Sequence, residues 1–301
     1  MPLKTRRMPQ ILPHKLGQDL AELTRPGNAL GPLLGLSIGR FASGYGGWHG
    51  YVISLVILLL IHSAATVQND IEDIDIDKTN KRHTALTDGT VTIQQAQTYF
   101  WVMSYGALLL CLLSPARRVT LLFVAMFFII SWLYNKAPFY LSRRPISSII
   151  CMGLSYGGLP MAFGYVSEGA PVSGKMLTFA VAWFILRVST SIMKDYKDAN
   201  GDKLHGKQTF FLKYGRRTTA SVSLLSGSLG YLAAIILTSG MSAGKWKYVS
   251  AFLLLLLTGK ILSVRFRLLK ADTKTSAKVF VETFRLQSFF DLAVLACLIA
   301  F

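Results

Sequence analysis

Long apolar stretches recur along the whole chain and are separated by short polar loops. Each stretch is close to the roughly 20 residues that a helix needs to cross a hydrocarbon core about 30 Å thick. Because lipid offers the backbone no hydrogen-bond partners, each stretch must be helical. The stretches lie at residues 27–43, 48–68, 94–114, 118–134, 146–167, 174–194, 217–239, 247–265 and 280–301.

This pattern predicts an all-α integral membrane protein that forms a bundle of about nine transmembrane helices. The first and fifth stretches are rich in Gly and Pro, so eight or ten crossings would also fit. Small residues also suit close packing of helices in a bilayer. The loops are too short to hold a soluble domain. We therefore expect residues 1–301 to form a single transmembrane domain, with a basic N-terminal tail over residues 1–26.

The composition supports a membrane protein. The chain is 52% hydrophobic and only 16% charged, with a mean hydropathy of +0.43, whereas an ordinary soluble domain is roughly 25% charged. A net charge of +17 could indicate a nucleic-acid partner, but the basic residues are spread over many short loops rather than one face. We therefore expect the bilayer, and no nucleic acid, as the partner. Cys111, Cys151 and Cys297 lie in apolar stretches without metal-ligand spacing and are interpreted as packing residues.

The basic residues also predict the orientation of the bundle. If the N-terminus is cytoplasmic, most of the 32 Lys and Arg residues lie on the cytoplasmic side, as is typical of multi-pass membrane proteins. Three others lie within the apolar stretches, namely Arg187, Lys260 and Arg285. Those on the opposite side are Arg40, Arg117, Arg118, Lys175, Lys245 and Lys247. We expect the N-terminus and the acidic loops described next to face the cytoplasm.

Two segments gather negative charge in this basic chain. Residues 69–78 (NDIEDIDIDK) and 194–210 (KDYKDANGDKLHGKQTF) hold eight of the 15 acidic residues, and each begins where an apolar stretch ends. We call them the first and second acidic stretches. On the nine-helix arrangement both lie on the same side of the membrane.

The spacing of the aspartates is the same in both stretches. Three aspartates follow one another at positions i, i+3 and i+7, which lie on one face if the preceding helix continues through the stretch. Glu72 and Asp75 fall off that face and are interpreted as bystanders. The two trios are Asp70, Asp73 and Asp77, and Asp195, Asp198 and Asp202.

Six converging carboxylates require cations. Two carboxylates about 6 Å apart repel by roughly 3 kcal/mol at an effective dielectric constant near 20. Hard oxygen ligands favour Mg²⁺, Mn²⁺ or Ca²⁺ over zinc, and Mg²⁺ is usually held together with substrate phosphates. We therefore expect a water-filled central cavity that opens to the cytoplasmic face, with divalent cations held between the trios. Lysines of the second stretch could meet phosphates there, namely Lys194, Lys197, Lys203 and Lys207.

Two simpler interpretations compete with a metal site. Asp73, Asp75 and Asp77 imitate the start of an EF-hand calcium loop, but its sixth position is Lys78 instead of Gly and its twelfth is Thr84 instead of Glu. The acids could also be ordinary solvated loop charges, but the recurrence of one spacing in two stretches argues against that.

The two stretches resemble the motifs of the UbiA superfamily of intramembrane prenyltransferases. The first family motif, N-D-x-x-D-x-x-x-D, is matched by Asn69, Asp70, Asp73 and Asp77. The second, D-x-x-D-x-x-x-D followed by G-K-x-T, is matched by Asp195, Asp198, Asp202, Gly206, Lys207 and Thr209. Residues 24–28 (TRPGN) are similar to the family's entry to its first helix. The resemblance covers nearly the whole chain and implies a bundle of nine helices.

The resemblance also implies roles for individual residues. The six aspartates would be catalytic and would hold Mg²⁺; we expect two ions, with Mn²⁺ able to replace them. Contacts to the diphosphate of a prenyl donor would come from Asn69, Tyr134, Lys136 and Lys207. The chain departs from the family at an Arg-Pro pair before a Gly, where it has Thr84 and Ala85. We expect Lys81 or Arg82 to take over the role of that arginine.

The activity implied is Mg²⁺-dependent transfer of a prenyl group from a prenyl diphosphate to an aromatic or other lipid-precursor acceptor. One alternative is a terpene cyclase of the same family, which ionises the same donor but needs no acceptor. A more remote alternative is a divalent-cation transporter, which would place acids near the middle of the membrane rather than at helix ends.

Residues within the apolar stretches complete the prediction. Arg187 needs a polar partner or a cavity, and we expect it to face the site and the diphosphate. His62, His83 and His205 are interpreted as hydrogen-bonded residues of helix ends or loops, and the sequence shows no convincing general base. Aromatic residues that could line a channel for the prenyl chain are Phe127, Phe128, Trp132, Trp183 and Phe184.

Overall fold

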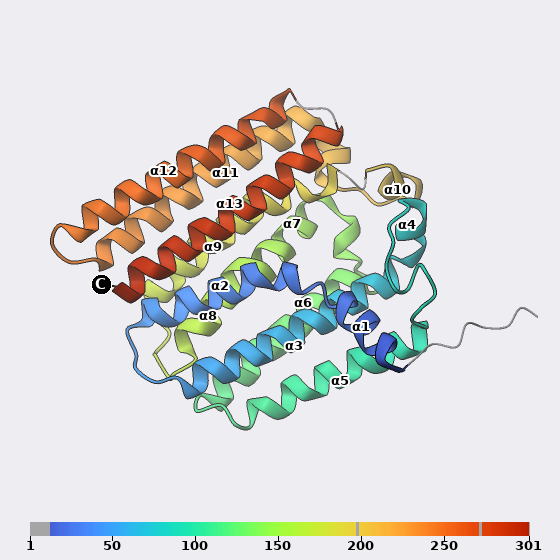
Figure 1. The fold of residues 1–301 in the computed structure, drawn as a ribbon, viewed down its shortest axis with the longest axis horizontal. Coiled ribbons are helices and arrows are strands. Elements are labelled where there is room, and N and C mark those ends of the chain that lie inside the picture. The colour runs from blue at the N-terminus through green and yellow to red at the C-terminus, as the bar shows by residue number, and fades with distance from the viewer. Residues whose placement is uncertain (1–12, 197–198, 271–272, 301) are drawn as a thin grey trace, which may run out of the picture.

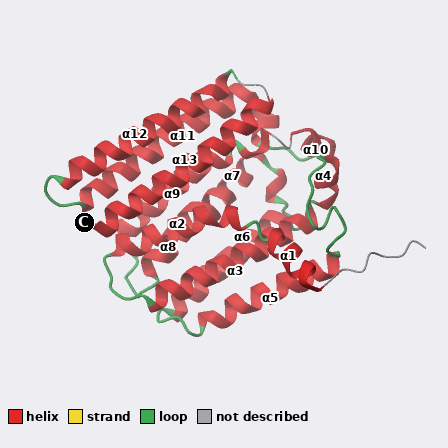
Figure 2. Cartoon of the chain, in the orientation of Figure 1, coloured by secondary structure: helices red, strands yellow, loops and turns green. Residues whose placement is uncertain are grey.

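The computed structural model describes residues 13–196, 199–270 and 273–300. These ranges contain helices and loops but no strand (Figures 1 and 2). The shorter helices are α1 (Pro13–Leu23), α4 (Ile74–Thr79), α7 (Pro145–Gly153), α8 (Leu159–Val166) and α10 (Ala199–Leu204). The longer helices are α2 (Pro26–Ser43), α3 (His49–Glu72), α5 (Ile93–Cys111), α6 (Arg117–Asn135), α9 (Gly174–Ser191), α11 (Phe210–Met241), α12 (Trp246–Phe266) and α13 (Thr273–Ala300).

Seven helical segments in the described ranges are long and apolar enough to cross a membrane. They are His49–Glu72, Arg117–Asn135, Pro145–Val166, Gly174–Tyr196, Phe210–Met241, Trp246–Leu269 and Thr275–Ala300. The prediction of an all-α integral membrane protein is therefore confirmed. The number of nine crossings stays a prediction, because α2 and α5 occupy two of the predicted stretches but are not apolar enough to be counted by composition.

Local sequence signals explain where several helices begin. Thr92 accepts a hydrogen bond from Gln95 N, while the Gln95 side chain accepts one from Thr92 N, which forms a capping box at the start of α5. Ser173 and Thr209 cap α9 and α11 in the same way, through a side-chain oxygen that accepts from a backbone N–H. Proline stands in the first turn of α2 and α7, where its missing N–H costs nothing.

Glycines allow α2 and α8 to touch backbone to backbone. A Cβ atom on Gly164 would overlap the carbonyl oxygen of Leu36, and one on Gly39 would overlap that of Met161. Leu36 and Met161 are fully buried in the largest apolar core. Small residues at such crossings are the usual means by which membrane helices approach closely. The pair α2 and α8 therefore forms a rigid support on the inner side of the bundle.

The two acidic stretches lie at one end of the bundle. Helices α4 and α10 lie side by side there, while α13 ends at the opposite end (Figure 1). Helix α1 packs on α3, within the range that we predicted as a basic tail (Figure 1). Leu16, Leu20 and Leu23 of α1 pack on a small apolar cluster with Val67 and Val91.

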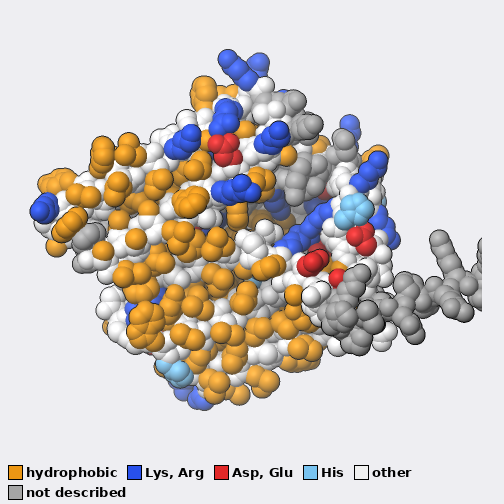
Figure 3. Space-filling view, viewed as in Figure 1, with side chains coloured by type: hydrophobic (Ala, Val, Ile, Leu, Met, Phe, Trp, Pro, Cys, Tyr) orange, Lys and Arg blue, Asp and Glu red, His pale blue; other side chains and the backbone are white. Residues whose placement is uncertain are grey.

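The outer surface matches a lipid environment over the middle of the bundle. Hydrophobic side chains cover most of the face in Figure 3, and charged side chains gather toward its upper and right-hand parts. Large apolar residues such as Leu109, Leu225 and Ile236 are exposed on the outside of the helices. This distribution is expected of a protein whose middle is surrounded by hydrocarbon.

We predict that Gly164→Ala destabilises the bundle. The added methyl group would meet backbone atoms of α2, which cannot rotate away, so overpacking should cost roughly 1 to 3 kcal/mol. Thermal unfolding in detergent should show a lower midpoint than the wild type. Gly259→Ala in α12 is the matched control, because nothing lies within 4 Å of its added Cβ. Equal midpoints for the two variants would contradict the packing described.

Candidate active site

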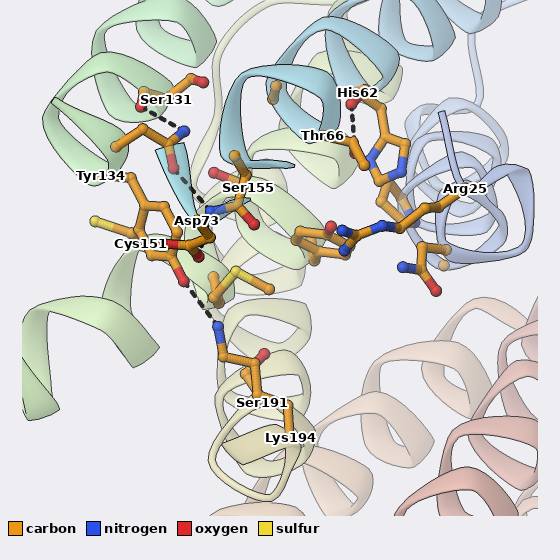
Figure 4. Close-up of a pocket in the computed structure, with 18 of the residues that line it drawn as sticks. Arg25, His62, Thr66, Asp73, Ser131, Tyr134, Cys151, Ser155, Ser191 and Lys194 are labelled. Atoms are coloured by element: carbon orange, nitrogen blue, oxygen red, sulfur yellow. Dashed lines mark hydrogen bonds between the residues drawn. The ribbon is translucent and has the colours of Figure 1, made fainter. Parts of the chain in front are cut away.

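A cavity of about 300 Å³ joins the two acidic stretches. Its lining residues come from helices throughout the chain, including α4 and α10, and Figure 4 shows part of this lining. Of the residues predicted for the site, those that line it are Asn69, Asp73, Asp77, Arg82, Tyr134, Arg187, Asp195, Asp202 and Lys207. Asp70, Lys81 and Lys136 do not line it, and Asp198 lies outside the described residues.

The first acidic stretch keeps the geometry expected of a helix. Helix α3 ends at Glu72 and α4 begins at Ile74. The N–H of Asp73 still bonds Asn69 O at 2.9 Å, and the N–H of Asp77 bonds Asp73 O at 2.8 Å. Helical spacing therefore continues through the bend. Asp73 and Asp77 both reach the cavity, whereas Asp75 is exposed and points elsewhere.

The described part of the second acidic stretch is not a continuous helix, so the condition for its aspartates to share one helical face is not met. Helix α9 ends at Ser191, a 3₁₀ turn carries Asp195, and Asp202 lies in the separate helix α10. Both aspartates nonetheless line the cavity. Tertiary contacts rather than helical spacing thus place them.

Helix α10 is held against α4 by polar contacts. The N–H of Gly201 donates to Asn80 Oδ1 at 2.9 Å, and a Cβ atom on Gly201 would overlap the Asn80 side chain. Next to it, Thr79 Oγ1 and His205 Nε2 are hydrogen-bonded at 2.8 Å. These contacts join the second acidic stretch to the two residues that directly follow the first.

Lys207 lies between carboxylates of the two stretches. Its Nζ atom is 3.3 Å from Asp73 Oδ2 and 3.6 Å from Asp202 Oδ1. Burial alone would lower the pKa of Lys207, but the attraction of Asp73, assisted by Tyr134 and Asp202, raises the pKa above its ordinary value. Asn69 Nδ2 also donates to Asp73 Oδ2, at 3.2 Å. A protein cation thus occupies the space between the two stretches.

Two arginines neutralise the other two aspartates of the first trio, Asp70 and Asp77. The Arg82 guanidinium lies 3.2 Å from Asp77 Oδ2, and Arg25 forms an ion pair with the buried Asp70. Burial and, next, the charge of Arg82 lower the pKa of Arg25 to about 10, so Arg25 stays charged at neutral pH. Lys81 is exposed, with a backbone φ of 54°, and does not reach the cavity.

Arg25 also lines the cavity, and we had not included it among the site residues. Arg25 belongs to residues 24–28 (TRPGN), which resemble the family's entry to its first helix. That resemblance did not assign Arg25 a contact in the site.

Tyr134 and Lys194 form one wall of the cavity. Lys194 Nζ donates to the Tyr134 hydroxyl at 2.7 Å. Figure 4 shows this pair beside Cys151 on one side, Arg25 and His62 on the other, and Asp73 between them.

Lys136 is turned away from the cavity wall. It forms an ion pair with Glu72, the acid that we interpreted as a bystander. The two residues instead neutralise each other beside the site.

The aromatic lining differs from the prediction. Phe127 lines the cavity as expected. Trp183 is fully buried in the helix core instead. Phe128, Trp132 and Phe184 are also absent from the lining, which includes Phe280 and Phe284 of α13, two residues that we did not predict.

His62 also differs from its interpretation. It lines the cavity from α3, is only 8% exposed, and its Nε2 atom is buried without a hydrogen-bond partner. Its ring lies edge-on to Tyr156 at 5.5 Å between centroids. His83 and His205 are hydrogen-bonded loop residues as expected, to Asp88 and Thr79. The apolar position of His62 within a helix gave no sign that it faces a cavity.

Arg187 has a partner that the sequence analysis missed. It forms a buried ion pair with Asp291 of α13 and donates to Gly31 O at 3.2 Å. Arg187 also lines the cavity, which is the position that we expected for it. A lone acid within the last apolar stretch was the available signal, because intramembrane charges are usually paired.

The side chains around the cavity fit a divalent cation by their chemistry. Carboxylates from both stretches face the same space, and these are the hard oxygen donors that Mg²⁺ prefers. Among the described residues, no group of three or more His, Cys, Asp or Glu side chains is close enough to hold a metal. Lys207 instead separates Asp73 from Asp202, and a metal would have to displace its ammonium group.

Comparisons with known proteins find similar chains among named prenyl-transferring enzymes and lipid synthases. A 2-acylphloroglucinol 4-prenyltransferase from Humulus lupulus is 27% identical over 56% of this chain, and the match spans 42% of that enzyme. A digeranylgeranylglyceryl phosphate synthase from Thermococcus gammatolerans is 28% identical over 93% of this chain and 96% of its own.

Among solved structures, a UbiA homolog from Archaeoglobus fulgidus bound to GPP and Mg²⁺ has the same fold. The TM-score is 0.68 at 18% identity, over 93% of this chain and 99% of that one. The UbiA prenyltransferase family itself matches residues 33–289. With a match over most of its length, and with both acidic stretches on one cavity, this chain belongs to the UbiA prenyltransferase family.

Proposed function

We propose that this protein is a Mg²⁺-dependent enzyme that transfers a prenyl group from a prenyl diphosphate to an aromatic or lipid-precursor acceptor. The observation that carries the proposal is the convergence of both acidic stretches on one cavity that also has apolar side chains in its walls. Leu58, Ile61, Phe127 and Ile130 supply apolar walls that suit an isoprenoid chain. Each CH₂ group removed from water contributes about 0.8 kcal/mol to binding.

The relatives support this class of substrate. The Archaeoglobus fulgidus homolog binds GPP and Mg²⁺. The Humulus lupulus enzyme is named for prenylation of an acylphloroglucinol, which is an aromatic acceptor, and the Thermococcus gammatolerans enzyme for a glyceryl phosphate lipid. Both types of acceptor are consistent with a hydrophobic cavity that has polar groups at one end.

The metal would be held by the carboxylates of both stretches. Asp73, Asp77, Asp195 and Asp202 line the cavity, and we also assign Asp70 and Asp198, for two Mg²⁺ ions that Mn²⁺ can replace. When bound, such ions stabilise the negative charge that develops on a leaving diphosphate.

The diphosphate would be held by the basic and polar groups around the carboxylates. Lys207 and Arg82 would turn from Asp73 and Asp77 to the diphosphate once metal ions neutralise these acids. Tyr134, Asn69 and Arg187 would add contacts from the walls. Lys136 could contribute only after leaving Glu72, and Lys81 only after a change of loop conformation.

We place the acidic end of the bundle on the cytoplasmic side, with the cavity open to it. The basic residues support this orientation through the positive-inside rule. A water-soluble diphosphate head group would then enter from the cytoplasm, while the prenyl chain stays among the helices.

Two alternatives differ in what they need. A terpene cyclase would consume the donor without an acceptor. A cation transporter would place its acids within the membrane-spanning helices, whereas Asp73, Asp77 and Asp202 lie at or beyond the end of α3 and in α10. Family membership also disfavours a transporter.

The direct test is turnover by the purified protein. With Mg²⁺, a prenyl diphosphate and a panel of aromatic and glycerol-phosphate acceptors, we expect diphosphate release and a prenylated product by mass spectrometry. Asp73→Asn should lower kcat by roughly 100-fold or more, because charge stabilisation at the leaving group is lost. Asp75→Asn is the matched control and should keep wild-type activity, since Asp75 is exposed.

Two results would contradict this proposal. A cyclised hydrocarbon formed without any acceptor would support the cyclase instead. Equal activity of the Asp73→Asn and Asp75→Asn variants would refute the assignment of the first acidic stretch.

We infer that Arg82, rather than Lys81, takes over the role of the family arginine. Arg82 lines the cavity and Lys81 is exposed. We predict that Arg82→Ala raises the KM for the prenyl diphosphate by about tenfold or more, since it removes a charged contact worth roughly 1.5 to 3 kcal/mol. Lys81→Ala should change the KM less than about threefold, as is typical of an exposed charge. The reverse order would show that the loop rearranges when substrate binds.

Removal of Lys207 should make stability depend on metal. In Lys207→Met, Asp73 and Asp202 lose the cation between them, so thermal unfolding in EDTA should begin at a lower temperature than in the wild type. Mg²⁺ should then raise the midpoint more in the variant than in the wild type, because it no longer competes with the ammonium group. Identical shifts in both proteins would argue against a metal site between the two stretches. Lys203→Met, which changes an exposed lysine of the same stretch, is the control.

A further inference from the structure

A second buried arginine, Arg265 near the end of α12, does not line the cavity. Its side chain is 0% exposed. Within the described part of the chain its hydrogen bonds all go to neutral groups, namely Ser189 Oγ at 2.8 Å, Ser223 O at 3.1 Å, Thr190 Oγ1 at 3.0 Å and Tyr231 OH at 3.3 Å. A buried charge without an acidic partner costs several kcal/mol. Such a residue requires a reason other than stability.

Helix α11 is shaped to receive this guanidinium group. A Cβ atom on Gly227 would lie 2.3 Å from Arg265 Nη1, so a larger residue there would displace the guanidinium group. One turn earlier, Ser223 accepts from Arg265 through its carbonyl oxygen. The Ser223 hydroxyl in turn donates to Ser189 O at 2.6 Å. Three helices, α9, α11 and α12, thus meet at Arg265.

The contacts concentrate on the point where α9 ends. Ser189 and Thr190 belong to the last turn of α9, which stops at Ser191. The last carbonyl groups of a helix lack partners within it and carry partial negative charge, which a nearby cation stabilises. The Ser223 hydroxyl donates to the carbonyl oxygen of Ser189. Arg265 donates to the hydroxyl groups of Ser189 and Thr190.

The end of α9 determines where the second acidic stretch begins. Lys194 and Asp195 follow within four residues of Ser191, in the 3₁₀ turn, and both line the cavity. Thr190 itself lines the cavity while it accepts from Arg265 on its other side. A shift in the last turn of α9 would therefore displace Asp195 relative to Asp73 and Lys207.

We propose that Arg265 is a positioning residue for the second acidic stretch. It acts through the end of α9 and holds Asp195 in register with the first acidic stretch, so that both can bind the same metal ions. The proposal rests on the metal site of the proposed function but does not depend on which acceptor is used.

Metal binding without substrate provides the test. Mn²⁺ is titrated into the detergent-purified protein and free Mn²⁺ is followed by electron paramagnetic resonance, with thermal unfolding measured in parallel. Arg265→Met should weaken Mn²⁺ binding by about tenfold or more, and Arg265→Lys should restore part of it. Arg267→Met is the matched control. Arg267 lies two residues further on, is 52% exposed and pairs with Glu282, so its removal should leave Mn²⁺ binding unchanged.

A second variant tests the proposal even if Arg265→Met does not fold. Gly227→Ala keeps the charge of Arg265 but displaces its guanidinium group, and should weaken Mn²⁺ binding in the same direction. Wild-type Mn²⁺ affinity in a folded Arg265→Met or Gly227→Ala variant, even with a lower unfolding temperature, would overturn the proposal. Absence of Mn²⁺ binding by the wild type would overturn it too. Wild-type Mn²⁺ binding without prenyl transfer would refute the proposed function alone.

Discussion

The site depends on the balance of negative charge at the end of an apolar bundle. Carboxylates that converge where water is scarce repel one another by several kcal/mol unless cations lie between them. Each carboxylate of the first stretch's trio has such a cation: Arg25 at Asp70, Lys207 at Asp73 and Arg82 at Asp77. Lys207 also faces Asp202 of the second stretch. The same charges that stabilise this arrangement are those that a metal–diphosphate complex would engage.

Rigid helix packing keeps these charges in place. The glycines of α2 and α8 bring backbones into contact, and Gly227 of α11 makes room for Arg265. The acidic stretches follow helix ends at the cavity: α4 begins directly after α3, and a 3₁₀ turn at Lys194–Tyr196 follows the end of α9 at Ser191. Glycines make the apolar stretches less hydrophobic, but they allow the close helix contacts on which the geometry of the site depends.

The sequence predicted the features that depend on local pattern. Apolar length predicted the helices, and the spacing of Asp70, Asp73 and Asp77 predicted a directed face, because one nearly continuous helix carries them. The second trio shares that spacing but not that structure, since contacts of Asn80 and Arg265 with α10 and α9 decide its course.

Residues that pair across the bundle were the ones that sequence analysis missed. Asp291 and Arg265 each lie alone in or beside an apolar stretch, and their partners are distant in sequence. The orientation of Lys136 depends in the same way on Glu72, 64 residues away. Only tertiary structure determines such pairs.

The most direct measurement is a structure of the protein with Mn²⁺ and a non-hydrolysable prenyl thiodiphosphate, with the metal located by anomalous scattering. We expect Mn²⁺ between carboxylates of both acidic stretches, in contact with the thiodiphosphate, and Lys207 moved from Asp73 onto its oxygens. Mn²⁺ bound to one stretch alone, or a thiodiphosphate bound away from both, would contradict a shared metal–diphosphate site.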